Sequence, residues 1–393
     1  MTNQKSKIKN YLIISCLSLI FYGCITDYEA TGIDEIAGIL VVEGLITEGE
    51  SYFTLSRSNY LTDNDWGWTS SSYIYNARVF VDRDDGEVFP AEPVDYYTFP
   101  PRYLVKTGEL YPDRRYRLRV EIDEYDHGDI GHGWMLPDSD VNIYEYLSEY
   151  TRPVITPEID SVFWTKRDRG QPIFIHVATK APDDDVMFFR WSFKEDWEVH
   201  SEYYIEEYPY YCWNRASSND FYMGSTQRTA FGMMIERLVE IPPSHFKLSQ
   251  LYRVNITQNA ISHRAYIYFE NIKKNNTQTG SIFAPIPSEL RGNIVCTTDP
   301  ARPVIGFIDV STTRSELLYI SRNDGLFEPF VRFDCVETPS DSLLVWYNYI
   351  PPWYVQIPQL EVGMPPMYIH NICVDCTFYG DQQSPDDWPN VYY

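Results

Sequence analysis

Hydrophobic and polar residues alternate with a period of two through much of the chain. Residues 116–123 place tyrosine, leucine, valine and isoleucine at every second position, with arginine, glutamate and aspartate between them. Because successive side chains of a strand point to opposite faces of a sheet, this segment predicts a strand with one buried face. Residues 41–46 and 53–57 predict two more strands. Residues 77–89 predict a hairpin that turns at Asp85-Gly86, since this pair accepts the positive φ of tight turns.

This pattern predicts a mainly β fold built from two β-sandwich-like domains of the immunoglobulin or fibronectin type. The first domain spans residues 36–150, and the second spans residues 151–393. A proline-punctuated stretch at 153–157 marks the boundary between them. The expected strands of the second domain are 159–162, 173–178, 188–197, 252–257 and 304–310.

One short helix is predicted near residues 262–275 of the second domain. Apolar residues recur there at helical spacing, Ser262 can cap the first turn, and Lys273 and Lys274 favour the negative end of the helix dipole. The tail from about residue 335 is rich in proline and aromatic residues. It is expected to pack as irregular structure against the second domain.

Residues 1–23 predict a lipoprotein signal peptide. Lys5, Lys7 and Lys9 precede an apolar run at 11–22, which is too short to span a bilayer. The run ends at Gly23-Cys24, and a small residue before cysteine is what lipoprotein signal peptidase requires. Cys24 is therefore the expected lipidation site, residues 24–35 the expected linker, and the lipid a membrane anchor. An ordinary cleaved signal peptide is the alternative.

Charge excludes one class of partner. The chain has 32 Lys and Arg against 56 Asp and Glu, which gives a formal net charge of -24. Nucleic acids and anionic lipid surfaces are bound through clustered basic residues, so no nucleic-acid partner is expected.

Five cysteines follow Cys24, and an exported protein is expected to form disulfides. An odd number leaves at least one thiol unpaired or paired between molecules. The CxxC spacing of the last two fits a structural bridge better than redox chemistry, because it lies near the C-terminus among prolines. A zinc site that uses His370 with three of the cysteines is an alternative. The disulfide candidates are Cys212, Cys296, Cys335, Cys373 and Cys376.

A glycine-rich string in the first domain is the candidate metal site. It offers two imidazoles and two carboxylates within seven residues, from Asp126, His127, Asp129 and His132. The alternative is a solvated loop between the domains. A calcium site at Asp63, Asp65 and Gly67 is less favoured, because the ligand spacing does not fit a calcium-binding loop. Residues 183–185 are more typical of a hairpin or loop tip with solvated acids than of a calcium site. No cofactor is expected.

Aromatic residues make up 16% of the chain, and two clusters are candidate contact surfaces for a ligand or partner. Exposed rings beside carboxylates can stack on sugars or anchor a protein interface. Their alternative role is to build β-cores and sheet edges. The first cluster has six rings in eleven residues, namely Tyr203, Tyr204, Tyr208, Tyr210, Tyr211 and Trp213. The second cluster is Trp66 and Trp68.

Catalysis has little support, because the sequence contains no nucleophile elbow, zinc-protease motif, phosphate loop or dinucleotide fingerprint. The chain is therefore not expected to be an enzyme.

Several segments, in order along the chain, resemble a family of Bacteroidota outer-membrane lipoproteins known as domain of unknown function 4249. The segments are Leu40-Val41-Val42-Glu43-Gly44, Thr54-Leu55-Ser56-Arg57-Ser58, Ile159-Asp160-Ser161-Val162, Gly280-Ser281-Ile282-Phe283, Pro303-Val304-Ile305-Gly306 and Cys373-Val374-Asp375-Cys376. The resemblance implies an envelope lipoprotein that is often encoded beside TonB-dependent receptors, and it supplies no catalytic residues.

The expected function is that of a lipid-anchored outer-membrane accessory protein that associates with a TonB-dependent nutrient-uptake receptor. Either the periplasmic or the cell-surface face of the outer membrane is compatible with this expectation. The alternative is a glycan- or peptide-capture module that binds through an exposed aromatic surface.

Overall fold

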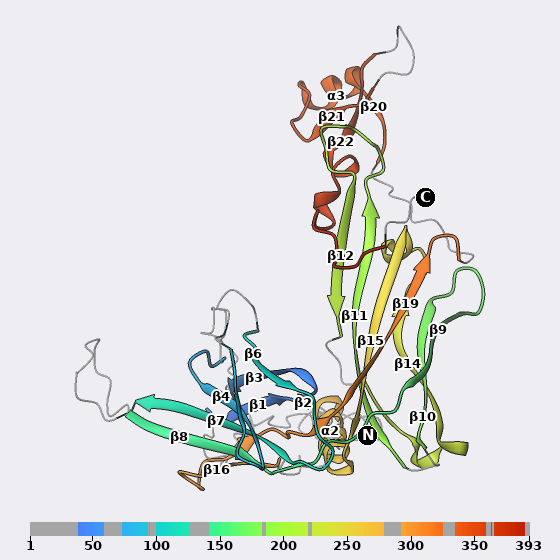
Figure 1. Ribbon diagram of the computed structural model, residues 1–393. Helices are drawn as coiled ribbons and strands as arrows, with labels where there is room; N and C mark the ends of the chain where they lie inside the picture. Colours follow the sequence, from blue (N-terminus) through green and yellow to red (C-terminus); the bar gives the residue numbers. More distant parts are fainter. Residues whose placement is uncertain are drawn as a thin grey trace, which may run out of the picture. The chain divides into compact units, whose positions relative to one another are not determined.

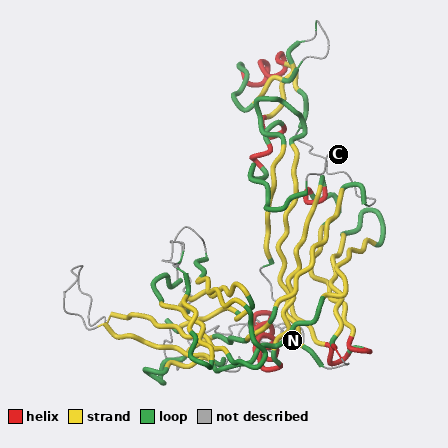
Figure 2. Tube along the Cα trace, viewed as in Figure 1, coloured by secondary structure: helices red, strands yellow, loops and turns green. Residues whose placement is uncertain are grey.

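The computed structural model describes residues 38–58, 73–92, 94, 100–125, 141–182, 186–218, 222–278, 292–324, 335–358, 363 and 365–389. Strands dominate this part of the chain, as Figure 2 shows in yellow, so the predicted mainly β class is confirmed.

Two sheets enclose the first core (Figure 1). The first sheet has the order β17-β1-β3-β6, with strands Val304–Ile305, Leu40–Gly44, Gly49–Arg57 and Tyr103–Gly108. The second has the order β16-β8-β7-β4-β5, with strands Ile294–Cys296, Val141–Ser148, Tyr116–Tyr125, Arg78–Arg83 and Val88–Pro90. A short pair, β2 (Ile46–Thr47) with β18 (Val310–Ser311), completes this sandwich.

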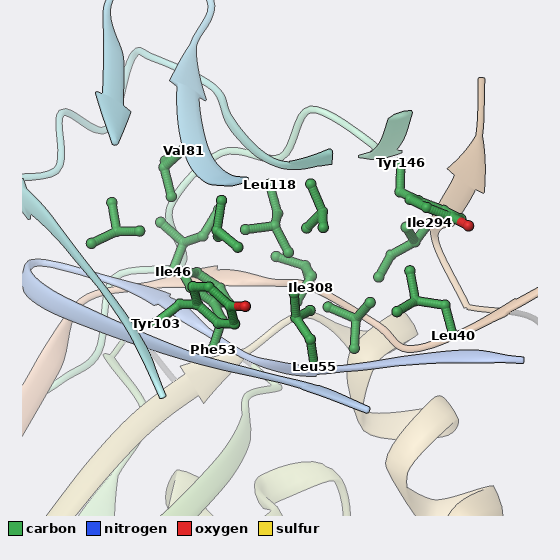
Figure 3. Packing of buried hydrophobic residues seen from close by; sticks show 14 of the residues in the cluster. Leu40, Ile46, Phe53, Leu55, Val81, Tyr103, Leu118, Tyr146, Ile294 and Ile308 are labelled. Atoms are coloured by element: carbon green, nitrogen blue, oxygen red, sulfur yellow. The ribbon is translucent and has the colours of Figure 1, made fainter. Parts of the chain in front are cut away.

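The alternating pattern places one face of each strand in this core. In β7, Tyr116, Leu118, Val120 and Ile122 are all buried, as the period of two predicts. Leu118 packs with residues of both sheets in Figure 3. The predicted hairpin is β4 and β5, and Gly86 in its turn has a φ of 96°.

A second sandwich surrounds a separate core. Its smaller sheet has the order β14-β10-β9, with strands Met233–Ile241, Ile173–Lys180 and Ile159–Lys166. Its larger sheet has the order β12-β11-β15-β19, with strands Tyr211–Ser217, Phe188–His200, Leu251–Ile261 and Thr313–Ser321, and β13 (Tyr222–Ser225) also pairs with β11. The predicted strands at 159–162, 173–178, 188–197 and 252–257 lie in these two sheets.

Residues 294–311 were expected in the second domain, but their strands pair with the first sandwich. β16 pairs with β8, while β17 and β18 run parallel to β1 and β2. A close backbone approach at Gly306 permits this pairing, because a Cβ there would lie 2.4 Å from the carbonyl oxygen of Val42. Strand pairing therefore cuts across the predicted division at residue 150.

The predicted helix is α2, His263–Gln278. Ser262 caps its first turn, since its Oγ accepts the N–H of Ala265 at 3.2 Å. Ala265, Tyr268 and Phe269 bury one side of the helix against Phe188 and Phe307. None of the helices in the described ranges is long and apolar enough to cross a bilayer.

The tail is more ordered than the predicted irregular structure. It contains helix α3 (Ser340–Tyr347) and a sheet with the order β20-β22-β21, whose strands are Thr338–Pro339, Met367–His370 and Tyr354–Gln356. Short 3₁₀ turns lie at Thr226–Arg228, Ala230–Gly232, Phe246–Leu248, Asn371–Cys373 and Cys376–Phe378.

Candidate functional site

The ordered part of the tail forms a small unit, here named the cysteine module and comprising residues 335–358 and 365–389. A disulfide between Cys335 and Cys373 closes the module on itself, and a second joins Cys376 to Cys212 at the start of β12. The bonded cysteines are 38 and 164 residues apart in sequence. Two covalent bonds therefore fix a segment that contains few buried apolar residues.

The expectation of disulfides is confirmed, but the CxxC pair does not close on itself. Each of its cysteines bonds a distant partner, so the sulfurs of the alternative zinc site are oxidised and have no thiolate to offer a metal. The remaining cysteine, Cys296, is buried and unpaired on β16, with its Sγ 3.4 Å from Thr298 Oγ1.

The loop that joins β11 to β12 carries most of the predicted aromatic cluster and attaches it to the module. The N–H of Tyr203 donates to the carbonyl of Cys373, and the N–H of Cys376 donates to the carbonyl of Pro209, both at 3.0 Å. The rings of Tyr203 and Tyr208 pack against the module core around Ile369. These two tyrosines therefore have a structural role.

The hydroxyl of Tyr203 donates to Glu337 at 2.8 Å. Burial and this carboxylate raise the pKa of Tyr203 to about 12, so the phenol stays protonated at neutral pH. This hydrogen bond is a further link between the loop and the module.

Two other tyrosines of the cluster face solvent, and a third, Tyr210, is half-buried. Tyr204 and Tyr211 are 66% and 54% exposed, and both contact the ring of Tyr210 edge to face, with centroids 5.6 and 4.8 Å apart. The ring of His200 lies 4.8 Å from that of Tyr211. The cluster therefore has two parts. Tyr203 and Tyr208 pack at the module core, and Tyr204 and Tyr211 form a small exposed aromatic surface.

Trp213 is half-buried and belongs to β12. Its backbone exchanges two hydrogen bonds of 2.7 Å with Asp381 of the tail. Nearby, the indole N–H of Trp388 donates to Glu198 at 3.1 Å, and the guanidinium of Arg253 lies over the Trp388 ring. These contacts attach the end of the tail to the larger sheet.

The largest exposed apolar surface of the module lies on and after α3. Leu343 is buried, whereas the next four helix residues face solvent, with Val345 and Trp346 at 82% and 65% exposure. The exposed set, here named the α3 surface, is Leu344, Val345, Trp346, Tyr347, Tyr349 and Trp353. A helix that is apolar on most sides is normally buried, so this surface is typical of an interaction site.

The cysteine module and the loop attached to it carry acidic residues and neither lysine nor arginine. Residues 335–393 contain seven Asp and Glu and neither Lys nor Arg. The attached loop at 201–210 adds Glu202, Glu206 and Glu207 and likewise lacks basic residues. A cationic partner is therefore favoured electrostatically over an anionic one.

Several sequence candidates lie outside the described residues. They are the lipidation site Cys24, the tryptophans Trp66 and Trp68, the metal-site candidates Asp126, His127, Asp129 and His132, and the calcium candidates Asp63, Asp65 and 183–185. Within the ranges that the structure does describe, His, Cys, Asp and Glu side chains form no group that could hold a metal ion.

The α3 surface is not among the contact surfaces predicted from the sequence. The run Leu343-Leu344-Val345-Trp346-Tyr347 could have indicated this surface, because it is apolar at every position. It also lies in a tail that contains neither Lys nor Arg. Because the run has no helical periodicity, it gave no indication of a buried and an exposed face.

Comparison with known protein families identifies one family. No curated protein matches the chain significantly. The family described as a domain of unknown function (DUF4249) matches residues 25–127 and 140–316, which cover both sandwiches up to the first residues of β19 and end before the cysteine module. Since these ranges make up more than half of the sequence, the chain belongs to this family.

Proposed function

We propose that the protein is a non-enzymatic, lipid-anchored accessory protein of the outer membrane that associates with a TonB-dependent nutrient-uptake receptor through the α3 surface. The observation that carries the proposal is this exposed apolar and aromatic surface on a module held by two disulfides. Tryptophan and tyrosine supply much of the binding energy of protein interfaces, because they bury a large area with few rotatable bonds.

A protein partner fits the α3 surface better than a lipid surface does. The acidic module would be repelled by anionic headgroups, whereas a receptor surface with an apolar centre and a basic rim complements it in both respects. The fixed geometry of the module adds to affinity, because a rigid surface loses little conformational entropy on binding.

The proposed location has separate support. Gly23-Cys24 follows a cationic start and an apolar run, as in bacterial lipoproteins, and the family resemblance favours Bacteroidota outer-membrane lipoproteins. Two disulfides agree with an oxidising compartment outside the cytosol. Mass spectrometry of the mature amino terminus tests the anchor directly, with the variant Cys24→Ser as the unlipidated control.

Site-specific photocrosslinking in cells tests the contact surface. A photoreactive amino acid at Val345 is expected to crosslink to an outer-membrane receptor, whereas the same group at Tyr52, 46% exposed on β3, is not. Trp346→Ala should weaken co-purification of that receptor on the order of tenfold, as expected when an interface aromatic is truncated.

Tyr52→Ala is the matched control, because it also removes an exposed ring. Equal co-purification of the receptor with both alanine variants, or crosslinking of position 345 to lipid alone, would contradict the proposed contact. Higher salt should also weaken the complex, since screening reduces the attraction between an acidic surface and a basic rim.

A second function, glycan or peptide capture, is favoured by the exposed rings of Tyr204 and Tyr211 beside acidic residues. Such rings can stack on sugar faces while carboxylates accept hydroxyl hydrogen bonds. Specific hits on a glycan array that are lost in Tyr204→Ala and Tyr211→Ala would support capture. Hits that persist in both variants would place glycan binding elsewhere on the protein.

A further inference from the structure

A cavity of about 350 Å³ lies among β1, β11 and α2, away from the cysteine module. Its volume is within the range of small-molecule sites in proteins. Phe269 and Ile272 of α2 and Phe307 supply an apolar wall. None of the residues of the α3 surface contributes to the cavity, so a ligand here would serve a purpose distinct from receptor docking.

A positively charged side chain, that of Arg190, lines this cavity. Arg190 of β11 is half-buried, and its guanidinium lies over the ring of Phe269 at 5.2 Å from the centroid. Burial lowers the pKa of Arg190, and the carboxylate of Glu43 opposes this effect. A guanidinium group is planar and offers paired N–H donors, so it is well shaped to bind a carboxylate.

Two further charges lie on exposed residues of the cavity wall. Glu43 of β1 and Arg102 line the cavity and are exposed. Neither makes an ion pair with another described residue. The wall thus offers a carboxylate for an ammonium group as well as guanidinium groups for a carboxylate.

Tyr268 adds a polar group to the same wall. Its hydroxyl is buried and donates to no acceptor among the described residues. Burial raises the pKa of Tyr268 to about 12, although a hydrogen bond from the backbone N–H of Gly306 opposes the rise, so at neutral pH the hydroxyl keeps its proton and can donate it. A buried donor without an acceptor is unfavourable, and a ligand oxygen near it would remove that penalty.

We propose that this cavity binds a small zwitterion with an apolar body, of the class of apolar α-amino acids or short-peptide termini. The carboxylate of the ligand lies beside Arg190, its ammonium faces Glu43, and its side chain packs against Phe269 and Phe307. A zwitterion with an aromatic body matches this set of residues better than a simple organic anion, which Glu43 would repel.

Three probes of similar size separate these contributions when their binding to the purified full chain is measured by calorimetry. L-Phenylalanine carries both charges, 3-phenylpropionate lacks the ammonium group, and 2-phenylethylamine lacks the carboxylate. L-Phenylalanine is expected to bind about tenfold more tightly than either analogue, because the loss of one charge-assisted hydrogen bond typically lowers binding affinity by about this factor.

Glu43→Gln should reduce the affinity for L-phenylalanine about tenfold and leave the affinity for 3-phenylpropionate unchanged or higher. Glu50→Gln, a change of another exposed carboxylate on β3, should alter neither affinity. Arg190→Gln should weaken both ligands, with circular dichroism and thermal melting to verify that this variant folds.

The proposal is overturned if no probe binds saturably up to about 10 mM, or if 3-phenylpropionate binds as tightly as L-phenylalanine. It is also overturned if Glu43→Gln and Glu50→Gln have the same effect. Because the cysteine module takes no part in this experiment, a negative result would leave the proposed receptor contact intact.

Discussion

The carboxyl group of Asp309 connects the start of α2 to the segment that completes the first sandwich. The side chain is 1% exposed, and its Oδ2 accepts the N–H of Ser262 at 2.6 Å. Its other oxygen, Oδ1, has no hydrogen-bond partner among the described residues. Burial raises the pKa of Asp309, although the hydrogen bonds from Ser262 oppose the rise. An ionised Asp309 is therefore only partly compensated for its desolvation.

Asp309→Asn should stabilise the protein at pH 7, because asparagine keeps an acceptor for Ser262 and removes the buried charge. The folded pKa of Asp309 is raised, so the stability linked to its protonated form is complete below the ordinary value of 3.8 and is lost as pH rises through the folded pKa. The difference in urea midpoint between variant and wild type should therefore shrink as pH falls toward 3.8.

Glu149→Gln is the control, and its effect on the stability of the protein at pH 7 is expected to be opposite to that of Asp309→Asn. A hydrogen bond from Arg264 lowers the pKa of Glu149, so its contribution is present above the ordinary value of 4.5 and is lost as pH falls through the folded pKa. This variant should be less stable than wild type at pH 7. A destabilised Asp309→Asn protein at pH 7 would show instead that the ionised Asp309 stabilises the fold.

The cysteine module depends on its disulfides because its own core is small. Four buried residues form that core, and two of its cluster members, Cys335 and Cys373, are bonded to each other. Small units without a large apolar core commonly need covalent links to stay folded. The exposed α3 surface can persist only while the module keeps its shape.

Replacing Cys335 and Cys373 together by serine should unfold the module locally and leave both sandwiches folded. Loss of a native disulfide from a small domain removes about 2–5 kcal/mol, since the unfolded chain regains loop entropy. Limited proteolysis should then cut within 335–389 much faster than in wild type. Cys296→Ala is the matched control, because it changes a cysteine outside both disulfides. Equal cleavage of the double variant and the control would show that packing alone holds the module.

The elements differ in how far sequence alone could predict them. Strand β7 and the β4–β5 hairpin could be predicted, because the alternation of apolar and polar residues and the residues of the turn lie within the segments themselves. The partners of Cys373 and Cys376 depend instead on which distant segments meet in space, and local spacing does not encode that. Helix α3 was missed because its residues are apolar on most sides, so neither helical nor strand periodicity marks it.

The two sandwiches are interleaved along one chain. After β8, the last strand of the first sandwich in this stretch, the chain forms most of the strands of the second sandwich. It then contributes β16, β17 and β18 to the first sandwich and finally β19 to the second. The predicted division into 36–150 and 151–393 describes the order of the strand-rich segments but not their pairing. Parallel pairing of β17 with β1 is a contact between distant residues, and only the three-dimensional structure reveals it.

This interleaving predicts that residues 39–150 do not fold on their own. The fragment lacks Ile294, Ile308 and Val310, which are buried in the first core. At roughly 1.5–3 kcal/mol for each buried aliphatic side chain, their loss removes about 5–9 kcal/mol, which is comparable with the whole stability of a typical domain. The fragment also leaves β8 and β1 without one neighbouring strand each.

Joining residues 292–312 to the fragment through a flexible glycine-serine linker should restore folding, because it returns both the core side chains and the missing strands. The same fusion with Ile308→Asp should stay unfolded, since a buried charge without a partner would replace an apolar contact. Amide dispersion in NMR spectra and cooperative thermal melting distinguish the three proteins. A cooperative transition in residues 39–150 alone would show that the first sandwich is complete without the returning segment, and the predicted boundary at residue 150 would then separate independent domains.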